Sequence, residues 1–233
     1  MNANRKTAIV VGILFITATV ATVISQVILG PILDTPDFLV NVSANRNQLV
    51  LGVLLELVDA FAVAGIAISI FSVLKNYNEG IAIGYVGFRV IEAAIAIIAS
   101  ISLLSLLTLS QEYVTAGTPV SSNYQNLSAF LLAAHDWTYL NMLIVFCLGA
   151  LLFYYLLYQS RLVPRFISAW GFIGTILALT AFMLQMFSII KDESTISNLF
   201  VLPIAVNEMV LAVWLIAKGF NSSEIAPPSV KQV

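Results

Sequence analysis

Cysteine, histidine and charged side chains are all scarce in this chain. Its 233 residues include one cysteine, Cys147, and one histidine, His135, and only 9% of the residues are charged. A single cysteine excludes an intrachain disulfide and any zinc or iron–sulfur centre built from cysteines. A single histidine excludes the His-Glu-x-x-His zinc proteases and every other site that needs two imidazoles. The sequence therefore predicts no metal site and no cofactor.

The shortage of charge also decides the broad class of protein. An average soluble domain carries roughly 25% charged residues, whereas 60% of this chain is hydrophobic and its mean hydropathy is +0.99. This composition excludes a soluble globular domain, and it excludes disorder because disordered chains are polar. The net charge of −2 provides no basic patch, so nucleic acid is not an expected partner. The expected partner is the lipid bilayer.

Six apolar stretches are long enough to cross a membrane. A span takes about 20 mostly apolar residues, and it folds as a helix because lipid offers no partner to backbone N–H and C=O groups. The stretches cover residues 7–29, 49–74, 81–107, 127–157, 166–190 and 199–217. We therefore predict an all-α integral membrane bundle of six transmembrane helices. It forms one domain over residues 1–220, and a disordered cytoplasmic tail follows at residues 221–233.

Basic residues predict how these spans are oriented, because cytoplasmic loops carry an excess of Lys and Arg. Seven basic residues fall on one predicted side: Arg5, Lys6, Lys75, Arg161, Arg165, Lys218 and Lys231. Only Arg46 and Lys191 fall on the other. Both termini are therefore expected in the cytoplasm of a multi-pass protein of the cell (plasma) membrane. The first stretch exceeds the roughly 7–15 residues of a signal-peptide core, so we expect an uncleaved helix.

Five ionisable residues lie well inside the predicted spans. They are Glu56, Asp59, Arg89, Glu92 and Glu208. A charge at the centre of a span costs about 2.5–3.5 kcal/mol on the insertion scale. With a rise of about 1.5 Å per residue, all but Glu56 fall near the middle of a hydrocarbon core about 30 Å thick. Ionisable residues at this depth usually serve a function.

Helical spacing sorts these residues by face. Tyr85, Arg89 and Glu92 are four and three residues apart, so they share one face of their helix. Glu56 and Asp59 are three apart and share a face of another helix. If both faces point into the bundle, the charges meet in one polar core at the middle of the membrane.

This predicted core defines a candidate binding site. Its ligand- or ion-binding candidates are Glu56, Asp59, Tyr85, Arg89, Glu92, His135, Asn141 and Glu208, with Asn207 close by. The acids outnumber Arg89, which can pair with only one or two of them. At least one acid is therefore expected to hold a proton or meet a cation, because a lone carboxylate loses its hydration on burial. Glu56 and Glu208 are the candidates.

Purely structural interpretations stay open beside this one. Polar groups between membrane helices also act as glue, worth about 0.6 kcal/mol on average where it has been measured. For His135, the neighbouring Asp136 and Trp137 favour a place at the membrane–water interface, because a polar pair next to an aromatic residue is typical of an interfacial belt.

Three segments together resemble a known family. They run from Gly84 to Ala93, from Ser160 through Arg165 to Gly171, and from Pro203 through Glu208 to Phe220. As a set they resemble the prokaryotic "domain of unknown function 4386" family of polytopic membrane proteins, over about residues 5–220. The resemblance implies several transmembrane helices in a prokaryotic cell membrane. It implies no activity and no catalytic residues.

Three functions remain open from the sequence. The first is binding or transport of a proton, a cation or a small polar ligand at the charged residues. The second is an intramembrane enzyme that acts on a lipid-like substrate, with Glu56, Asp59 or Glu208 as acid or base. The third is a structural or partner-binding membrane subunit whose charges set only the helix register. Protein partners are not predicted.

Overall fold

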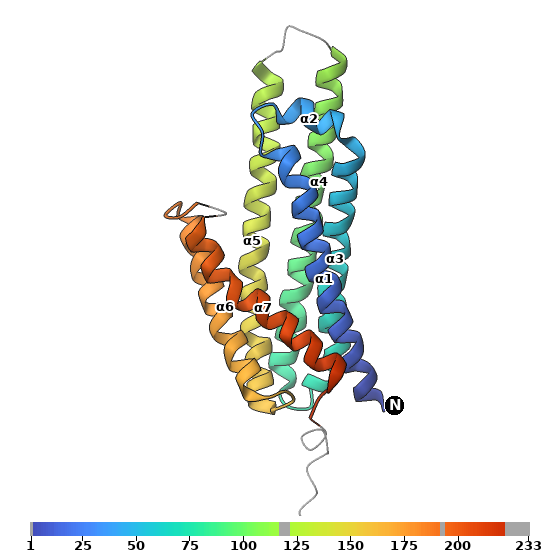
Figure 1. Ribbon diagram of the computed structural model, residues 1–233, viewed down its shortest axis with the longest axis vertical. Coiled ribbons are helices and arrows are strands. Elements are labelled where there is room, and N and C mark those ends of the chain that lie inside the picture. The colour runs from blue at the N-terminus through green and yellow to red at the C-terminus, as the bar shows by residue number, and fades with distance from the viewer. Residues whose placement is uncertain (1, 117–121, 192–193, 222–233) are drawn as a thin grey trace, which may run out of the picture. The chain divides into compact units, whose positions relative to one another are not determined.

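The computed structural model describes residues 2–116, 122–191 and 194–221, and every regular element in these ranges is a helix (Figure 1). The helices are α1 Ala3–Leu33, α2 Phe38–Ala44, α3 Arg46–Leu74, α4 Glu79–Ala116, α5 Ser122–Ser160, α6 Arg165–Met186 and α7 Thr195–Ala217. All except α2 are long and apolar enough to cross a membrane. The predicted all-α architecture with six spans is confirmed.

Several helix ends differ from the predicted ones. Helix α4 continues to Ala116 and α5 begins at Ser122, whereas the apolar stretches stop at 107 and start at 127. Hydropathy marks only the part of a helix that matches lipid, and helices continue past it on polar residues. Helix α6 ends early, at Met186, because Ser188 adopts a φ of +55°, outside the helical region. Most of the predicted disordered tail, residues 222–233, lies outside the described ranges.

The short helix α2 was not predicted. It has seven residues, and it buries Leu39 and Val42, which are three apart and so lie on one helical face. This short amphipathic pattern is the signal that a search for long apolar runs overlooks.

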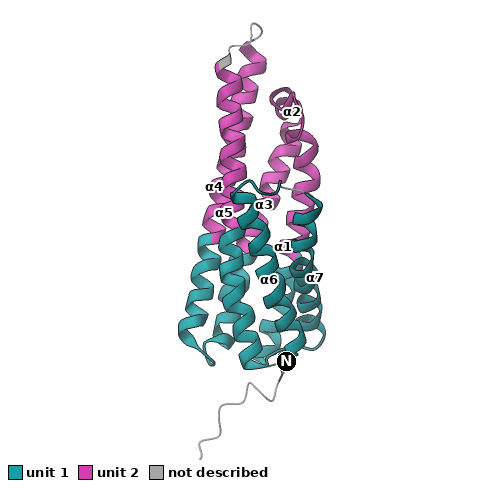
Figure 2. Cartoon of the chain, turned by 90° about the vertical axis from the view of Figure 1, so that its left-hand side faces the viewer, with its two compact units in different colours: residues 1–16, 63–91, 143–233 teal, residues 17–62, 92–142 magenta. Residues whose placement is uncertain are grey.

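Contacts group the chain into two compact units (Figure 2). Unit 1 consists of Met1–Ile16, Val63–Ile91 and Leu143–Val233, and unit 2 of Thr17–Ala62 and Glu92–Met142. Helices α6 and α7 therefore belong to unit 1 and α2 to unit 2, while the other four helices contribute residues to both. The single domain over residues 1–220 stays a prediction.

In unit 1, α6 and α7 pack against each other as a hairpin (Figure 1). Gly174 of α6 allows the close approach, because a Cβ there would lie 3.0 Å from the backbone nitrogen of Ile204. Two side-chain hydrogen bonds join the helices: Asn207 Nδ2 donates to the Ile167 carbonyl at 2.9 Å, and Gln185 Nε2 donates to Ser197 Oγ at 2.6 Å. Small residues and polar bonds are the usual contacts between membrane helices.

Aromatic rings fill the space between α4, α5 and α6 within unit 1. Tyr85 stacks on Phe153 with ring centroids 4.9 Å apart, and the ring of Tyr154 lies 5.2 Å from that of Phe153. Gly171 of α6 faces Tyr154 so closely that a Cβ would come within 2.2 Å of the ring. The absence of a side chain at Gly171 therefore lets α6 pack on this aromatic cluster.

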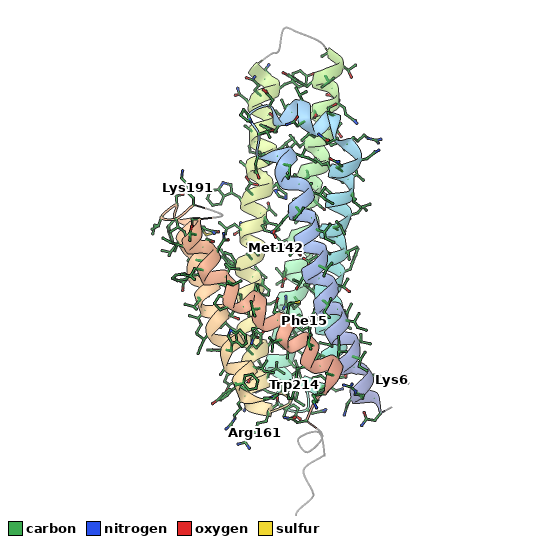
Figure 3. The ribbon with its side chains drawn as sticks, viewed as in Figure 1. Lys6, Phe15, Met142, Arg161, Lys191 and Trp214 are labelled. Carbon is green, nitrogen blue, oxygen red and sulfur yellow. The ribbon has the colours of Figure 1, made fainter. Side chains whose placement is uncertain are left out.

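The start of α1 holds the end of α7. The Arg5 guanidinium donates to the carbonyls of Leu215, Ile216 and Ala217, the last residues of α7. The Leu215 carbonyl also accepts from the backbone N–H of Gly219 at 3.1 Å. Carbonyls in the last turn of a helix lack partners within the helix, and a cation is favoured there by the helix dipole. The neighbouring Lys6 lies at the same end of unit 1 as Arg161, and Lys191 lies at the opposite end of the α6–α7 hairpin (Figure 3).

Unit 2 has an aliphatic core drawn from α1, α2, α3 and α4. Its buried members are Leu29, Ile32, Leu39, Val42, Leu49, Val53, Leu103, Leu106 and Leu107. Hydroxyls add links between elements: Ser25 Oγ donates to the Gly52 carbonyl at 3.0 Å, and Ser110 Oγ donates to the Leu39 carbonyl. The short helix α2 thereby packs into this core.

We expect Gly171→Ala to lower the midpoint of thermal unfolding of the detergent-purified protein, because overpacking typically costs about 1–3 kcal/mol. Gly87→Ala is the matched control, since a Cβ at Gly87 meets nothing within 4 Å. This control should leave the midpoint unchanged or raise it, because Ala is favoured over Gly inside helices by roughly 0.5–1 kcal/mol. Equal midpoints for the two variants would contradict the close packing of Gly171 on Tyr154.

We expect Arg5→Gln to lower the free energy of unfolding by about 1.5–3 kcal/mol, the usual value of a hydrogen bond to a charged group. The measurement is unfolding in mixed micelles with increasing fractions of sodium dodecyl sulfate. Lys6→Gln removes the same charge from the neighbouring, exposed position and serves as the control. A protein with Arg5→Gln that is as stable as the control would show that Arg5 does not hold α7.

Candidate functional site

Arg89 of α4 is the buried cation around which the candidate site of unit 1 is built. Only 2% of its side chain is exposed. Its Cζ lies 5.6 Å from the centre of the Tyr85 ring, one helical turn earlier, and 5.0 Å from that of Phe146 on α5. A cation within about 6 Å of a ring face is attracted to it, by about 2 kcal/mol when water is excluded. The two rings therefore stabilise the guanidinium within the span.

Glu208 of α7 supplies an opposite charge to Arg89. Its Oε1 lies 3.9 Å from Arg89 Nη2, and 17% of the Glu208 side chain is exposed. This distance suits an ion pair but exceeds the roughly 2.7–2.9 Å of a direct charge-assisted hydrogen bond. Residues 119 positions apart in sequence are thus brought together, on two helices of the same unit.

A buried hydroxyl of α5 adds to this site, and α7 carries a further buried polar atom one residue before Glu208. Within the described residues, the Tyr154 hydroxyl and Asn207 Oδ1 have no hydrogen-bond partner. Tyr154 also interacts electrostatically with Arg89, Glu208 and Tyr85. An unsatisfied buried polar atom costs about 1–3 kcal/mol, and a bound molecule is one explanation for it. The Tyr154 hydroxyl is therefore the buried polar group that α5 adds to the surroundings of Arg89 and Glu208.

A second group of candidates lies in unit 2, around His135 of α5. His135 Nε2 lies 3.7 Å from Glu56 Oε1 of α3, and Nδ1 lies 3.2 Å from Asp136 Oδ1. The ring also stacks on Tyr139, whose hydroxyl accepts a hydrogen bond from Gln26 of α1 at 3.3 Å. The structure therefore buries His135 against an acid of a neighbouring helix.

The remaining candidates are also in unit 2. Glu92 is buried and Asp59 is half-buried. Asn141 is exposed, and its Nδ2 donates to the Trp137 carbonyl of its own helix at 2.9 Å. In the described part of the chain, no three His, Cys, Asp or Glu side chains are placed to hold a metal ion. The single polar core shared by all the candidates stays a prediction.

Two residues of the unit 1 site were not among the predicted candidates. Phe146 packs on Arg89, and Tyr154 brings its hydroxyl near the ion pair. Aromatic residues make up 11% of this chain and occur in every span, so neither position carries a signal of its own. The run of three aromatic residues, Phe153-Tyr154-Tyr155, does not by itself indicate which ring lies near the ion pair.

A family model described as Domain of unknown function (DUF4386) matches residues 10–219. The chain belongs to this family. The match confirms the resemblance that the three sequence segments indicated, and it covers all eight candidate residues. No curated protein and no solved structure matches the chain. The role of this DUF4386 protein must therefore be argued from its own site.

The Arg89–Glu208 pair predicts a non-additive effect on stability. Arg89→Gln alone should cost about 3–5 kcal/mol, because breaking a buried pair leaves an opposite charge behind. The double variant with Glu208→Gln should cost less than the sum of the two single changes. Free energies of unfolding of the four proteins in mixed micelles measure this coupling.

A second double-mutant cycle, of Arg89→Gln with Glu79→Gln, is the control. Glu79 is an exposed acid of the same unit. Its effect should add to that of Arg89→Gln, since distant sites are independent within about 0.5 kcal/mol. Additive effects for Glu208 as well would show that the pair contributes nothing to stability.

Proposed function

We propose that this DUF4386 protein binds a small anionic solute at Arg89 together with a proton at Glu208. The observation that carries the proposal is the ion pair between these two side chains of unit 1, whose exposed fractions are small. Binding of this kind supports a role as a transporter or a sensor. The alternative of an intramembrane enzyme also requires a route by which a lipid-like substrate reaches the carboxylates. The ion pair does not support such a route, so we favour binding over catalysis.

Charge balance couples the two ligands. Arg89 cannot lose its proton in a protein, so only Glu208 changes the charge of the pair. When Glu208 takes up a proton, the net charge of the pair rises from zero to +1. A buried charge is costly unless it is paired, and a carboxylate or phosphate group restores neutrality. When Glu208 releases the proton, it competes with the anion for Arg89.

The surroundings of Arg89 favour an anion of this type. A guanidinium is planar and presents donors in a fork that matches carboxylate and phosphate oxygens. The rings of Tyr85 and Phe146 lie against it and limit its movement. The Tyr154 hydroxyl is a further donor for an anion, and it lacks a hydrogen-bond partner among the described residues. Glu208 is the more exposed partner of the pair, so we expect the proton to enter and leave on its side.

We also infer the location of the protein. Six apolar helices suit a multi-pass protein, and the family resemblance supports the plasma membrane of a prokaryotic cell. The excess of basic residues on one predicted side supports cytoplasmic termini. Lys6 and Arg161 lie at one end of unit 1, as that orientation requires, with Lys191 at the other end of the α6–α7 hairpin (Figure 3).

Anion-induced thermal stabilisation tests the proposal. The detergent-purified protein is titrated with sodium acetate and with sodium phosphate, at constant ionic strength, near pH 5.5 and near pH 8. A ligand that binds only the folded state raises stability by RT ln(1 + [L]/Kd). In the wild type we expect the rise to be larger at the lower pH. Glu208→Gln, which mimics the protonated acid, should show the rise at both.

Two further variants make the result specific. Arg89→Gln should abolish the anion effect at both pH values, because it removes the binding charge. Glu79→Gln, which changes an exposed acid of the same unit, should behave like the wild type. The proposal fails if Arg89→Gln retains the anion response, or if Glu208→Gln keeps the pH dependence of the wild type.

A further inference from the structure

The surroundings of His135 in unit 2 contain an electrostatic conflict. Its side chain is 11% exposed, and each ring nitrogen faces a carboxylate oxygen: Nε2 faces Glu56 Oε1 at 3.7 Å, and Nδ1 faces Asp136 Oδ1 at 3.2 Å. A neutral imidazole carries a proton on only one nitrogen. Whichever nitrogen that is, the other directs a lone pair at a carboxylate oxygen, and two acceptors repel each other.

One additional proton removes the conflict. An imidazolium has a proton on both nitrogens, so it donates toward both acids. The need is greatest on the Glu56 side, because only 14% of that side chain is exposed, compared with 66% for Asp136. The exposed Asp136 has more room to turn away from the ring than the mostly buried Glu56. Within the described residues, Glu56 Oε2 and His135 Nε2 are also buried without a hydrogen-bond partner.

We propose that Glu56, His135 and Asp136 form a proton-binding site in unit 2, with the proton held on the imidazole and exchanged with water through Asp136. Uptake adds one proton to a ring nitrogen and raises the charge of the ring from zero to +1, and no electrons move. Asp136 forms the exposed side of the site, and Glu56 forms the buried side. The site uses neither Arg89 nor Glu208, so it goes beyond the anion site of unit 1.

The charges that act on His135 come from Glu56 and Asp136. Helix α1 contributes Gln26, which is not ionisable and binds the Tyr139 hydroxyl beside the ring. The other ionisable side chains of unit 2 on α3, α4 and α5 are Arg46, Asp59, Glu92, Glu112, Tyr113, Tyr124 and Tyr139.

Nuclear magnetic resonance of the ring itself tests the site. Because His135 is the only histidine, labelling the protein with ¹⁵N-histidine reports this one imidazole. In lipid nanodiscs near pH 7.5, the wild type should show two protonated ring nitrogens. Glu56→Gln should show one protonated and one bare nitrogen, because the buried acceptor has lost its charge. Glu112→Gln, a change at an exposed acid of the same unit, should match the wild type.

A conservative variant guards against a folding defect. Glu56→Asp keeps the carboxylate and should keep the imidazolium, and circular dichroism checks that each variant retains its helices. A bare nitrogen in the wild type overturns the proposal, and so do two protonated nitrogens in folded Glu56→Gln. If Glu56→Gln does not fold, the wild type and Glu56→Asp still decide, because a neutral ring in either overturns the site. The readout needs no anion, so this site and the anion site can fail separately.

Discussion

A charge within an apolar helix must be neutralised by the protein, because hydrocarbon offers it neither water nor counter-ions. Arg89 meets this condition with an acid from α7 and with two aromatic ring faces. The arrangement requires α4, α5 and α7 to come together at one place within unit 1. Gly171 and Gly174 leave room for the packing of α6 on its neighbours.

The spans could be predicted because hydropathy depends only on local composition. Their ends could not, because the helical hydrogen-bond pattern continues where apolar residues stop. Thr108 to Ala116 are largely polar, yet they remain helical in α4. The end of α6 depends instead on the backbone of Ser188, whose positive φ no apolar pattern signals. The short α2 is stabilised by tertiary contacts of Leu39 and Val42, which lie beyond local sequence.

For the candidate site too, the sequence predicts local features but not the contacts between helices. Helical periodicity predicts that Tyr85, Arg89 and Glu92 share one face, and all three are buried. It could not reveal which helix lies opposite that face. That Arg89 meets Glu208, and that His135 meets Glu56, follows from how the helices pack. Phe146 was missed for the same reason, since only its contact with Arg89 distinguishes it from other aromatic residues.

The Arg89–Glu208 pair and the His135–Glu56 pair differ in kind. Arg89 keeps its charge under all ordinary conditions, so the first pair changes only when Glu208 takes up a proton, and its net charge then becomes positive. At the proton site proposed for the second pair, loss of the proton from His135 leaves the negative charge of Glu56 behind. Proton uptake by Glu208 therefore leaves the positive charge of Arg89 without its partner. Proton release by His135 leaves the negative charge of Glu56 without its partner. A protein with both arrangements responds to acid and to base through different residues. Variants of Glu208 and of Glu56 should consequently separate the two responses.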